Sequence, residues 1–209
     1  MLVRDVMSAP VLTIPPSTTL RDAAALLHER SIRHLPVVEE GRLVGVITDR
    51  DLRCVTSTLC ESPYDAGAPV ARAMARPPVT ADPMDAVEEA ARAMRERKIG
   101  CLPVVQDGSV VGIVTGMDLL DAIIRMAGAG LPSGRMEVVL ADRPGELARL
   151  TGLLGQRNVN IHAILTYPDG EGVVRTVLRL DSIETRRLAE ALRETGFEVL
   201  WPPRKPWQR

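Results

Sequence analysis

The feature that most constrains the fold is an internal repeat. Residues 6–53 and 73–120 align without a gap at a spacing of 67 residues, and 19 of the 48 aligned positions are identical. The identities include Leu35–Val38 and Leu102–Val105, so the match indicates a duplicated structural unit. A unit of this size is small for an independent hydrophobic core. The two units should therefore pack on each other as a pseudo-two-fold pair.

Each unit has the pattern of a βαββα fold, beginning with an extended piece and a helix. In the first unit the extended piece is Val11 to Ile14, and Pro15-Pro16 prevents a helix from starting there. Ser17 or Thr18 can then cap a helix that runs from Leu20 to about Arg30. Its apolar face at helical spacing consists of Leu20, Ala23, Ala24 and Leu27.

Two strands and a second helix complete the unit. Residues 35–38 and 43–48 should form strands around a turn at Glu40-Gly41, and the second strand is apolar enough to be buried on both faces. A helix should follow from Thr48 to about Cys54. The second unit repeats this order, with a helix at 85–97, strands at 102–105 and 110–115, and a helix at 116–126.

A threonine and an aspartate recur three residues apart after each buried strand, as Thr48 with Asp51 and Thr115 with Asp118. Each pair lies where a helix begins, and the unpaired N–H groups there favour anions such as phosphate. A carboxylate at this offset can also accept hydrogen bonds from the two ribose hydroxyls. A helix cap alone would explain one such pair. Its recurrence at the same offset favours a ligand-binding role.

Composition excludes several other classes. The net charge is −1, from 26 basic and 27 acidic residues, and only five side chains are aromatic, which argues against nucleic-acid binding. No apolar run is long enough for a membrane helix, and Met1 to Pro10 has no signal-peptide pattern, so a cytoplasmic location is expected. Cys54, Cys60 and Cys101 form no disulfide framework and have no zinc spacing, and Cys101 should be a small buried side chain.

These motifs resemble the CBS domain family in its tandem arrangement, the Bateman module. The resemblance covers about residues 1–125 and implies a pair of clefts that bind adenosine nucleotides (AMP, ADP or ATP) or S-adenosylmethionine. The residues that carry it are Ile32–Val38 and Gly45–Asp51, with their counterparts Ile99–Val105 and Gly112–Asp118.

The resemblance implies a different content for each cleft. In the first, Asp51 would hold the ribose and Thr48 would lie near the phosphate, which Arg33, His34 and Arg50 could also meet. In the second, Thr115 and Asp118 would have the corresponding roles. Because Gly100, Cys101, Gly116 and Met117 replace Arg33, His34, Asp49 and Arg50, the second cleft lacks local cations. The stronger site should be the one around Asp51, and the second should hold an uncharged adenosine moiety or nothing.

After a linker at 126–134, rich in small residues, the pattern changes to βαββαβ, a ferredoxin-like plan over residues 135–202. The alternation of Met136, Val138 and Leu140 predicts the first strand. The later strands should be 158–167, 173–180 and 197–201. The helices should be 146–156, with Leu147, Leu150 and Leu154 on one face, and 184–195, before a short tail at 203–209.

This region resembles the ACT domain, a small regulatory module that binds amino acids or serves as a dimerisation surface. The resemblance rests on Leu140–Leu147 and Asn158–Ile161. It implies that Asp142, Gly145 and Asn160 are the candidate ligand-binding residues. Alternatively, Gly145 only makes the turn and Asn160 only caps a strand.

The order of two CBS repeats (1–60 and 61–126) and an ACT domain resembles that of bacterial acetoin-utilisation accessory proteins. The expected function is a regulatory, ligand-sensing homodimer that needs no cofactor and has an effector protein as a possible further partner. No nucleotide-binding loop, nucleophile elbow or His–Cys dyad is present, so an enzyme is not expected. An oligomerisation adaptor with empty clefts is the alternative.

Overall fold

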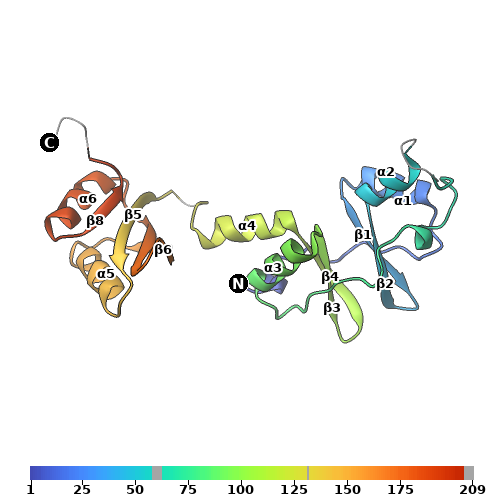
Figure 1. Ribbon diagram of the computed structural model, residues 1–209, viewed down its shortest axis with the longest axis horizontal. Helices are drawn as coiled ribbons and strands as arrows, with labels where there is room; N and C mark the ends of the chain where they lie inside the picture. Colours follow the sequence, from blue (N-terminus) through green and yellow to red (C-terminus); the bar gives the residue numbers. More distant parts are fainter. Residues whose placement is uncertain (58–62, 131, 205–209) are drawn as a thin grey trace. The chain divides into compact units, whose positions relative to one another are not determined.

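The computed structural model describes residues 1–57, 63–130 and 132–204. The chain divides into two compact units, Met1–Ala122 (unit 1) and Ile123–Arg209 (unit 2) (Figure 1). Unit 1 contains the sequence repeats and unit 2 contains the C-terminal region. Both units combine helices with antiparallel sheets, which confirms the mixed α and β fold class.

The two repeats of unit 1 form the same elements in the same order. Each hairpin is antiparallel, and both have a register shift at the same place, between Val37 and Val38 and between Val104 and Val105. The leading extended piece of each repeat forms only an isolated bridge, at Ile14 and at Ala81, and no strand. The other predicted elements are confirmed, with ends displaced by one or two residues. They are α1 (Leu20–Glu29), β1 (His34–Glu39), β2 (Arg42–Thr48) and α2 (Asp49–Thr56), then α3 (Val87–Arg97), β3 (Cys101–Gln106), β4 (Ser109–Thr115) and α4 (Gly116–Met126).

The segment in front of each repeat packs on the other repeat. Ser8 pairs with Ile113 of β4, and Ala75 pairs with Val46 of β2. The chain then returns to its own hairpin, where Ile14 lies beside Val37. In sequence the repeats follow one another, whereas in space each is completed by a piece of its neighbour. The same exchange joins Val3 N to Asp85 O at 2.9 Å and Val70 N to Thr18 O at 2.8 Å.

Gly45 and Gly112 occupy corresponding places on β2 and β4, directly under these crossing segments. A Cβ atom on Gly45 would lie 2.6 Å from Met74 Sδ and 3.1 Å from the Ala75 carbonyl oxygen. On Gly112 it would lie 2.7 Å from Met7 Sδ and 3.1 Å from a backbone oxygen. A side chain at either position would therefore have to displace a methionine side chain of the crossing segment and would also press on that segment's backbone oxygen.

Unit 2 has the predicted βαββαβ order. Its four strands form one antiparallel sheet in the order β6-β7-β5-β8, and leucines of both helices enter the same core as Met136, Val138 and Leu140 of β5. One face of the sheet is therefore covered by helices. The elements are β5 (Gly134–Ala141), α5 (Glu146–Gln156), β6 (Ile161–Pro168), β7 (Val173–Leu180), α6 (Thr185–Glu194) and β8 (Glu198–Trp201).

Some details of the sequence-based prediction are wrong. Thr19, not Ser17 or Thr18, caps α1, because its hydroxyl oxygen accepts a hydrogen bond from Asp22 N at 3.1 Å. Ala24 and Leu147 are exposed, because the faces that α1 and α5 bury are narrower than the apolar stripes in the sequence. The predicted tail beyond Arg204, Cys60 and the repeat boundary at 60/61 lie outside the described residues.

The close approach at Gly45 and Gly112 predicts that an added methyl group destabilises the protein more at these two positions than at Gly116. Gly45→Ala and Gly112→Ala should each lower the free energy of unfolding by about 1–3 kcal/mol, because the added atom overlaps a neighbouring segment. Gly116→Ala is the matched control, since nothing lies within 4 Å of its Cβ position at the start of α4. Urea unfolding followed by circular dichroism measures all three. Equal stabilities for Gly45→Ala and Gly116→Ala would contradict the packing argument.

Candidate functional site

The two Thr–Asp pairs form nearly identical structures at the starts of α2 and α4. Thr48 is the N-cap of α2, and its Oγ1 accepts a hydrogen bond from Asp51 N at 3.1 Å. In return Asp51 Oδ2 accepts from Thr48 N at 3.0 Å and from Thr48 Oγ1 at 2.7 Å. For Thr115 and Asp118 the corresponding distances are 3.4, 2.7 and 2.7 Å. Both pairs are therefore capping boxes.

The capping box leaves part of each aspartate available. All the bonds to Asp51 and Asp118 end on Oδ2, and within the described residues no hydrogen bond reaches Oδ1 of either side chain. An ionised carboxylate has about four acceptor positions. Helix capping and hydrogen bonding to a sugar hydroxyl are therefore compatible roles for the same side chain.

A third Thr–Asp pair, at the start of α1, has the same hydrogen bonds as the other two but a different location. Thr19 and Asp22 make the same hydroxyl and amide hydrogen bonds at the start of α1, at 2.7 and 3.1 Å, but that pair is exposed. The pairs at Thr48 and Thr115 are partly buried, at the ends of β2 and β4, the two strands through which the repeats meet. Their position, and not the cap itself, distinguishes them as candidate binding residues.

The loop before each hairpin is tied to the start of the following helix. Asp49 N donates to Arg33 O at 3.0 Å, and in the second repeat Gly116 N donates to Gly100 O at 3.1 Å. The register sets His34 opposite Thr48 and Cys101 opposite Thr115. The structure thus brings Arg33, His34, Thr48 and Asp51 to one end of the first hairpin. The side chains of Arg33 and Arg50 are exposed there.

His34 connects the two repeats. A Cβ atom on Gly100 would lie 3.0 Å from His34 Nε2, so the imidazole rests against the backbone of the second repeat. Burial lowers the pKa of His34, and the nearby Arg33 lowers it further, while Asp49 and Asp51 oppose the shift. The sequence indicated His34 as a phosphate contact, but its contact with Gly100 could not be found from sequence because the two residues are 66 positions apart.

Cys101, the counterpart of His34, is buried as predicted. Burial raises the pKa of its thiol to about 12, and the charge of Asp51 contributes to the rise. A thiol with this pKa remains protonated at neutral pH and is a poor nucleophile. Among the described residues, no group of three His, Cys, Asp or Glu side chains could hold a metal ion.

In unit 2 the predicted ligand turn is well formed. Gly145 is the N-cap of α5 and has a φ of 93°, a left-handed conformation that favours glycine. The next residue, Glu146, is buried and accepts hydrogen bonds from Arg143 at 2.7 Å and Arg149 at 2.9 Å, which lower the pKa of its carboxyl group. Sequence reasoning missed this pair of arginines, although both lie three residues from Glu146.

The three candidate residues of unit 2 do not meet within one chain. Asp142 follows the end of β5, where its amide donates to Gly172 O at 2.9 Å. Asn160 precedes β6, and its carbonyl accepts from Asp181 N at 2.9 Å, beside the start of β5. Asp142 and Gly145 therefore lie at one end of the sheet and Asn160 at the other.

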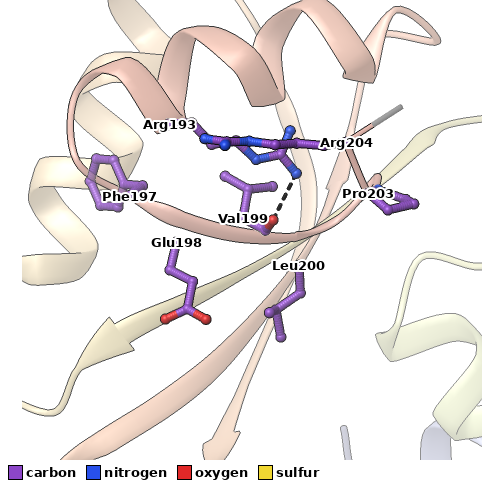
Figure 2. A pocket seen from close by; sticks show the side chains of 7 residues that line it. All are labelled: Arg193, Phe197, Glu198, Val199, Leu200, Pro203 and Arg204. Carbon is purple, nitrogen blue, oxygen red and sulfur yellow. Dashed lines mark hydrogen bonds between the residues drawn. The ribbon is translucent and has the colours of Figure 1, made fainter. Parts of the chain in front are cut away.

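Two hollows lie away from all these residues. One of about 510 Å³ lies between the hairpin turns of unit 1, beside Glu40–Leu43 and Asp107–Ser109. The other, of about 360 Å³, lies between α6 and β8 in unit 2 (Figure 2). There Arg193 donates to Val199 O at 2.7 Å and to Pro202 O at 2.6 Å, so it ties β8 to α6.

None of the described helices combines the length and the apolar character needed to cross a membrane.

Comparison with known proteins agrees with this division of the chain. The family model "CBS domain" matches residues 3–55 and 70–125, and the model "ACT domain" matches residues 135–197. The CBS domain-containing protein YhcV of Bacillus subtilis is 35% identical over 117 residues, which are 56% of this chain and 81% of that protein. A CBS domain-containing protein of Dictyostelium discoideum is 41% identical over 134 residues, 60% of this chain and 92% of that one.

Solved structures of CBS proteins are also similar. The Vibrio cholerae protein described as acetoin utilization protein AcuB has a TM-score of 0.55 at 31% identity, over 62% of this chain and 96% of that one. The CBS domain pair of MJ0100, solved with 5′-methylthioadenosine and S-adenosyl-L-methionine, has a TM-score of 0.53 at 33% identity, over 59% and 95%. CBSX2, solved with AMP, has a TM-score of 0.54 at 30% identity, over 60% and 97%.

The burial of His34 predicts a specific pH dependence of stability. A histidine whose pKa is lower in the folded state binds fewer protons than in the unfolded chain, so stability is lost as the pH falls below 6.5, its ordinary value. The free energy of unfolding should therefore decline less between about pH 7 and pH 5 in His34→Asn than in the unsubstituted protein. His28→Asn, at an exposed position, should decline as the unsubstituted protein does. Urea titrations measure this, and parallel declines in all three would contradict it.

Proposed function

Because the chain belongs to the CBS domain family, with two CBS domains followed by an ACT domain, we propose that it is a regulatory protein that binds an adenosine compound between its CBS repeats. The observation that carries the proposal is the pair of partly buried capping boxes, in which one oxygen of each aspartate accepts no hydrogen bond from the described residues. The relatives solved with AMP, and with S-adenosyl-L-methionine and 5′-methylthioadenosine, support the ligand class.

The first cleft is proposed to bind an adenosine phosphate. Asp51 would accept hydrogen bonds from the ribose through Oδ1, while its Oδ2 maintains the helix cap. Thr48 lies at the helix start, where the N–H groups attract phosphate oxygens. Arg33 and Arg50 add exposed guanidinium groups that remain charged at any physiological pH.

The second cleft is proposed to prefer an uncharged adenosine moiety. Thr115 and Asp118 repeat the geometry of the first pair, but Gly100, Gly116 and Met117 bring no charge. Without local cations, a phosphate group would lose its hydration with no charge to compensate it. A nucleotide should therefore bind less tightly there than an adenosine derivative with a neutral group in the same place. The relative solved with 5′-methylthioadenosine and S-adenosyl-L-methionine supports the possibility that a CBS pair binds an uncharged adenosine derivative.

The ACT domain is proposed to complete its amino-acid site only in a dimer. Asp142 and Asn160 lie at opposite ends of one sheet, too far apart for one amino acid to touch both. In a two-fold dimer whose strands run in opposite directions, the Asp142 end of one copy can meet the Asn160 end of the other. The backbone N–H groups around Gly145 would then bind the carboxylate of the ligand.

Self-association is proposed to use α4 as well. Four of its large apolar side chains are between 49% and 64% exposed, which is unusual for one short helix of a monomer. An isologous contact between two copies of this helix would remove them from water. These residues are Met117, Leu120, Ile123 and Ile124.

The remaining expectations complete the proposal. The chain would act in the cytoplasm, without a required cofactor and without catalysing a reaction, and would pass its signal to an effector protein. An oligomerisation adaptor with empty clefts is the competing function. The observation that favours the adaptor is the equivalent Thr–Asp cap at Thr19, which forms at an exposed helix start outside the clefts.

Titration of AMP and ATP by calorimetry tests the two clefts. Asp51→Ala should weaken phosphate-bearing ligands by about 10- to 100-fold, because each hydrogen bond to a charged group contributes about 1.5–3 kcal/mol. Asp118→Ala should leave this binding nearly unchanged and should weaken 5′-methylthioadenosine instead. Asp22→Ala is the matched control, since it removes an equivalent helix cap outside the clefts. Equal losses in Asp51→Ala and Asp118→Ala would contradict the asymmetry.

A thermal melt separates the sensor from the adaptor. A ligand at 100 times its dissociation constant should stabilise the protein by about 2.7 kcal/mol. Melting curves that do not move with AMP, ADP, ATP, S-adenosylmethionine or 5′-methylthioadenosine would favour the adaptor. Turnover of any of these compounds would favour an enzyme.

A mixing experiment tests the shared ACT site. Asp142→Ala and Asn160→Ala should each abolish binding of the amino acid that a panel selects, because each damages every site. Mixing the two variants and allowing subunits to exchange should restore about a quarter of the sites, since half of the dimers are mixed and each has one intact site. Calorimetry of the mixture measures the stoichiometry. No recovery after verified exchange would contradict a site formed by two copies.

A further inference from the structure

His34 of β1 lies beside the helix start at which the first cleft is proposed to hold a phosphate. It is the direct cross-strand partner of Thr48, the N-cap of α2. Side chains of such partners point to the same side of an antiparallel pair, with Cβ atoms about 4.5–5.5 Å apart. The imidazole of His34 and the hydroxyl of Thr48 therefore face the same space at the end of the hairpin.

The second repeat closes the other side of this imidazole. A Cβ atom on Gly100 would lie 3.0 Å from His34 Nε2 and 3.6 Å from Cε1, so the ring fills the space beside that glycine. Because Gly100 has no side chain, it brings neither a charge nor a side-chain hydrogen-bonding group to the ring. The ring is thus held in place by packing and not by a polar partner.

The ring nitrogens of His34 make no hydrogen bond to any residue that the structure describes. Among these residues, no side-chain nitrogen or oxygen is both fully enclosed and without a partner, so the ring nitrogens of the partly buried His34 remain accessible. A neutral imidazole has one N–H donor and one acceptor nitrogen, and a protonated imidazole has two donors. His34 therefore keeps hydrogen-bonding capacity that the chain itself does not use.

The charged groups around the ring leave it mainly neutral at pH 7 in the chain alone. Burial lowers the pKa of His34, and the nearby Arg33 lowers it further. Together these effects outweigh those of Asp49 and Asp51, which raise the pKa. Both carboxylates already have partners, since Asp49 pairs with Arg53 at 2.9 Å and Asp51 Oδ2 accepts the hydrogen bonds of the helix cap. A further negative charge would have to come from a ligand.

A phosphate group at the start of α2 supplies that charge, about −1.5 to −2 at pH 7, together with acceptor oxygens. We propose that a phosphate-bearing ligand binds in the first cleft together with one proton from solvent, which His34 takes up and holds against the phosphate. No covalent bond forms, and the neutral imidazole becomes a cation with two N–H donors. This inference rests on the proposed function, because it needs an adenosine phosphate in that cleft.

The second cleft has no group that could do the same. Cys101 lies at the position of His34, opposite Thr115. Its thiol is uncharged at neutral pH, because burial raises its pKa to about 12, and it does not become a cation when the pH falls. Proton uptake therefore belongs to the first cleft alone. It makes the affinity of that cleft for phosphate-bearing compounds increase as the pH falls.

NMR titration of the histidine side chains in the full chain tests the inference directly. The chain has only three histidines, and the variants His28→Asn and His34→Asn identify the signals of the two in unit 1. Saturation with AMP should raise the midpoint of the His34 titration by about one pH unit or more, whereas that of His28, exposed on α1, should not move. Saturation with adenosine, which has no phosphate, should move neither. A His34 midpoint that AMP does not raise, or that adenosine raises equally, would overturn the inference.

Calorimetry measures the consequence for affinity. From pH 8 to pH 6.5 the affinity for AMP should rise about three- to tenfold more in the unsubstituted protein and in His28→Asn than in His34→Asn, because only His34 gains a proton on binding. Protonation of the phosphate itself affects all three chains equally, and circular dichroism verifies that they remain folded. Equal pH dependences would overturn the inference and leave nucleotide binding intact. If AMP binds to none of the three chains, the proposed function is overturned together with this inference.

Discussion

The structure of unit 1 depends on the mutual completion of two repeats that are each small for an independent hydrophobic core. Neither hairpin can bury both of its faces within its own repeat, so the segment in front of each repeat crosses to the other and covers it. The crossing brings a methionine side chain and a backbone oxygen within 3.1 Å of the Cβ positions of Gly45 and Gly112, and the glycines leave room for both. Gly45 and Gly112 lie three residues before Thr48 and Thr115. Their role in the shared motif is to leave room for the crossing segment.

This arrangement also sets the position of the candidate binding residues. Because the repeats meet through β2 and β4, the ends of these strands, with their capping boxes, lie at the junction of two chain segments instead of on an open surface. Because the repeats are duplicates, the backbone has the same form at the ends of β2 and β4. The side chains around these two ends differ, because the sequences of the repeats differ there. His34 and Gly100 are an example of this difference. The imidazole of His34 occupies the space that a side chain at Gly100 would fill.

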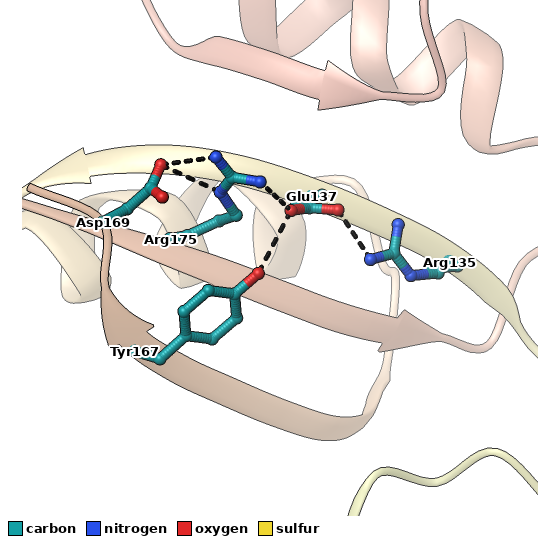
Figure 3. Close-up of polar contacts among 5 residues, drawn as sticks. All are labelled: Arg135, Glu137, Tyr167, Asp169 and Arg175. Carbon is teal, nitrogen blue, oxygen red and sulfur yellow. Dashed lines mark hydrogen bonds and ion pairs between the residues drawn. The ribbon is translucent and has the colours of Figure 1, made fainter.

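Unit 2 is built differently. Its helices form a single layer, so its hydrophobic core lies on only one face of the sheet. The helix-covered face is aliphatic, whereas on the face that the helices leave uncovered Glu137 accepts hydrogen bonds from Arg135, Arg175 and Tyr167 (Figure 3).

The amino-acid sequence by itself determined the repeat, the order of elements in both units, the two capping boxes and the buried character of Cys101. Each of these depends on local spacing or on the polarity of a short segment, which a single stretch of chain expresses. Only the tertiary structure decided that the leading segments exchange between repeats, that His34 rests on Gly100, and that Asp142 and Asn160 lie at opposite ends of a sheet. These facts depend on contacts between residues far apart in the chain, and such contacts arise from the direction in which strands pair, which no local pattern specifies.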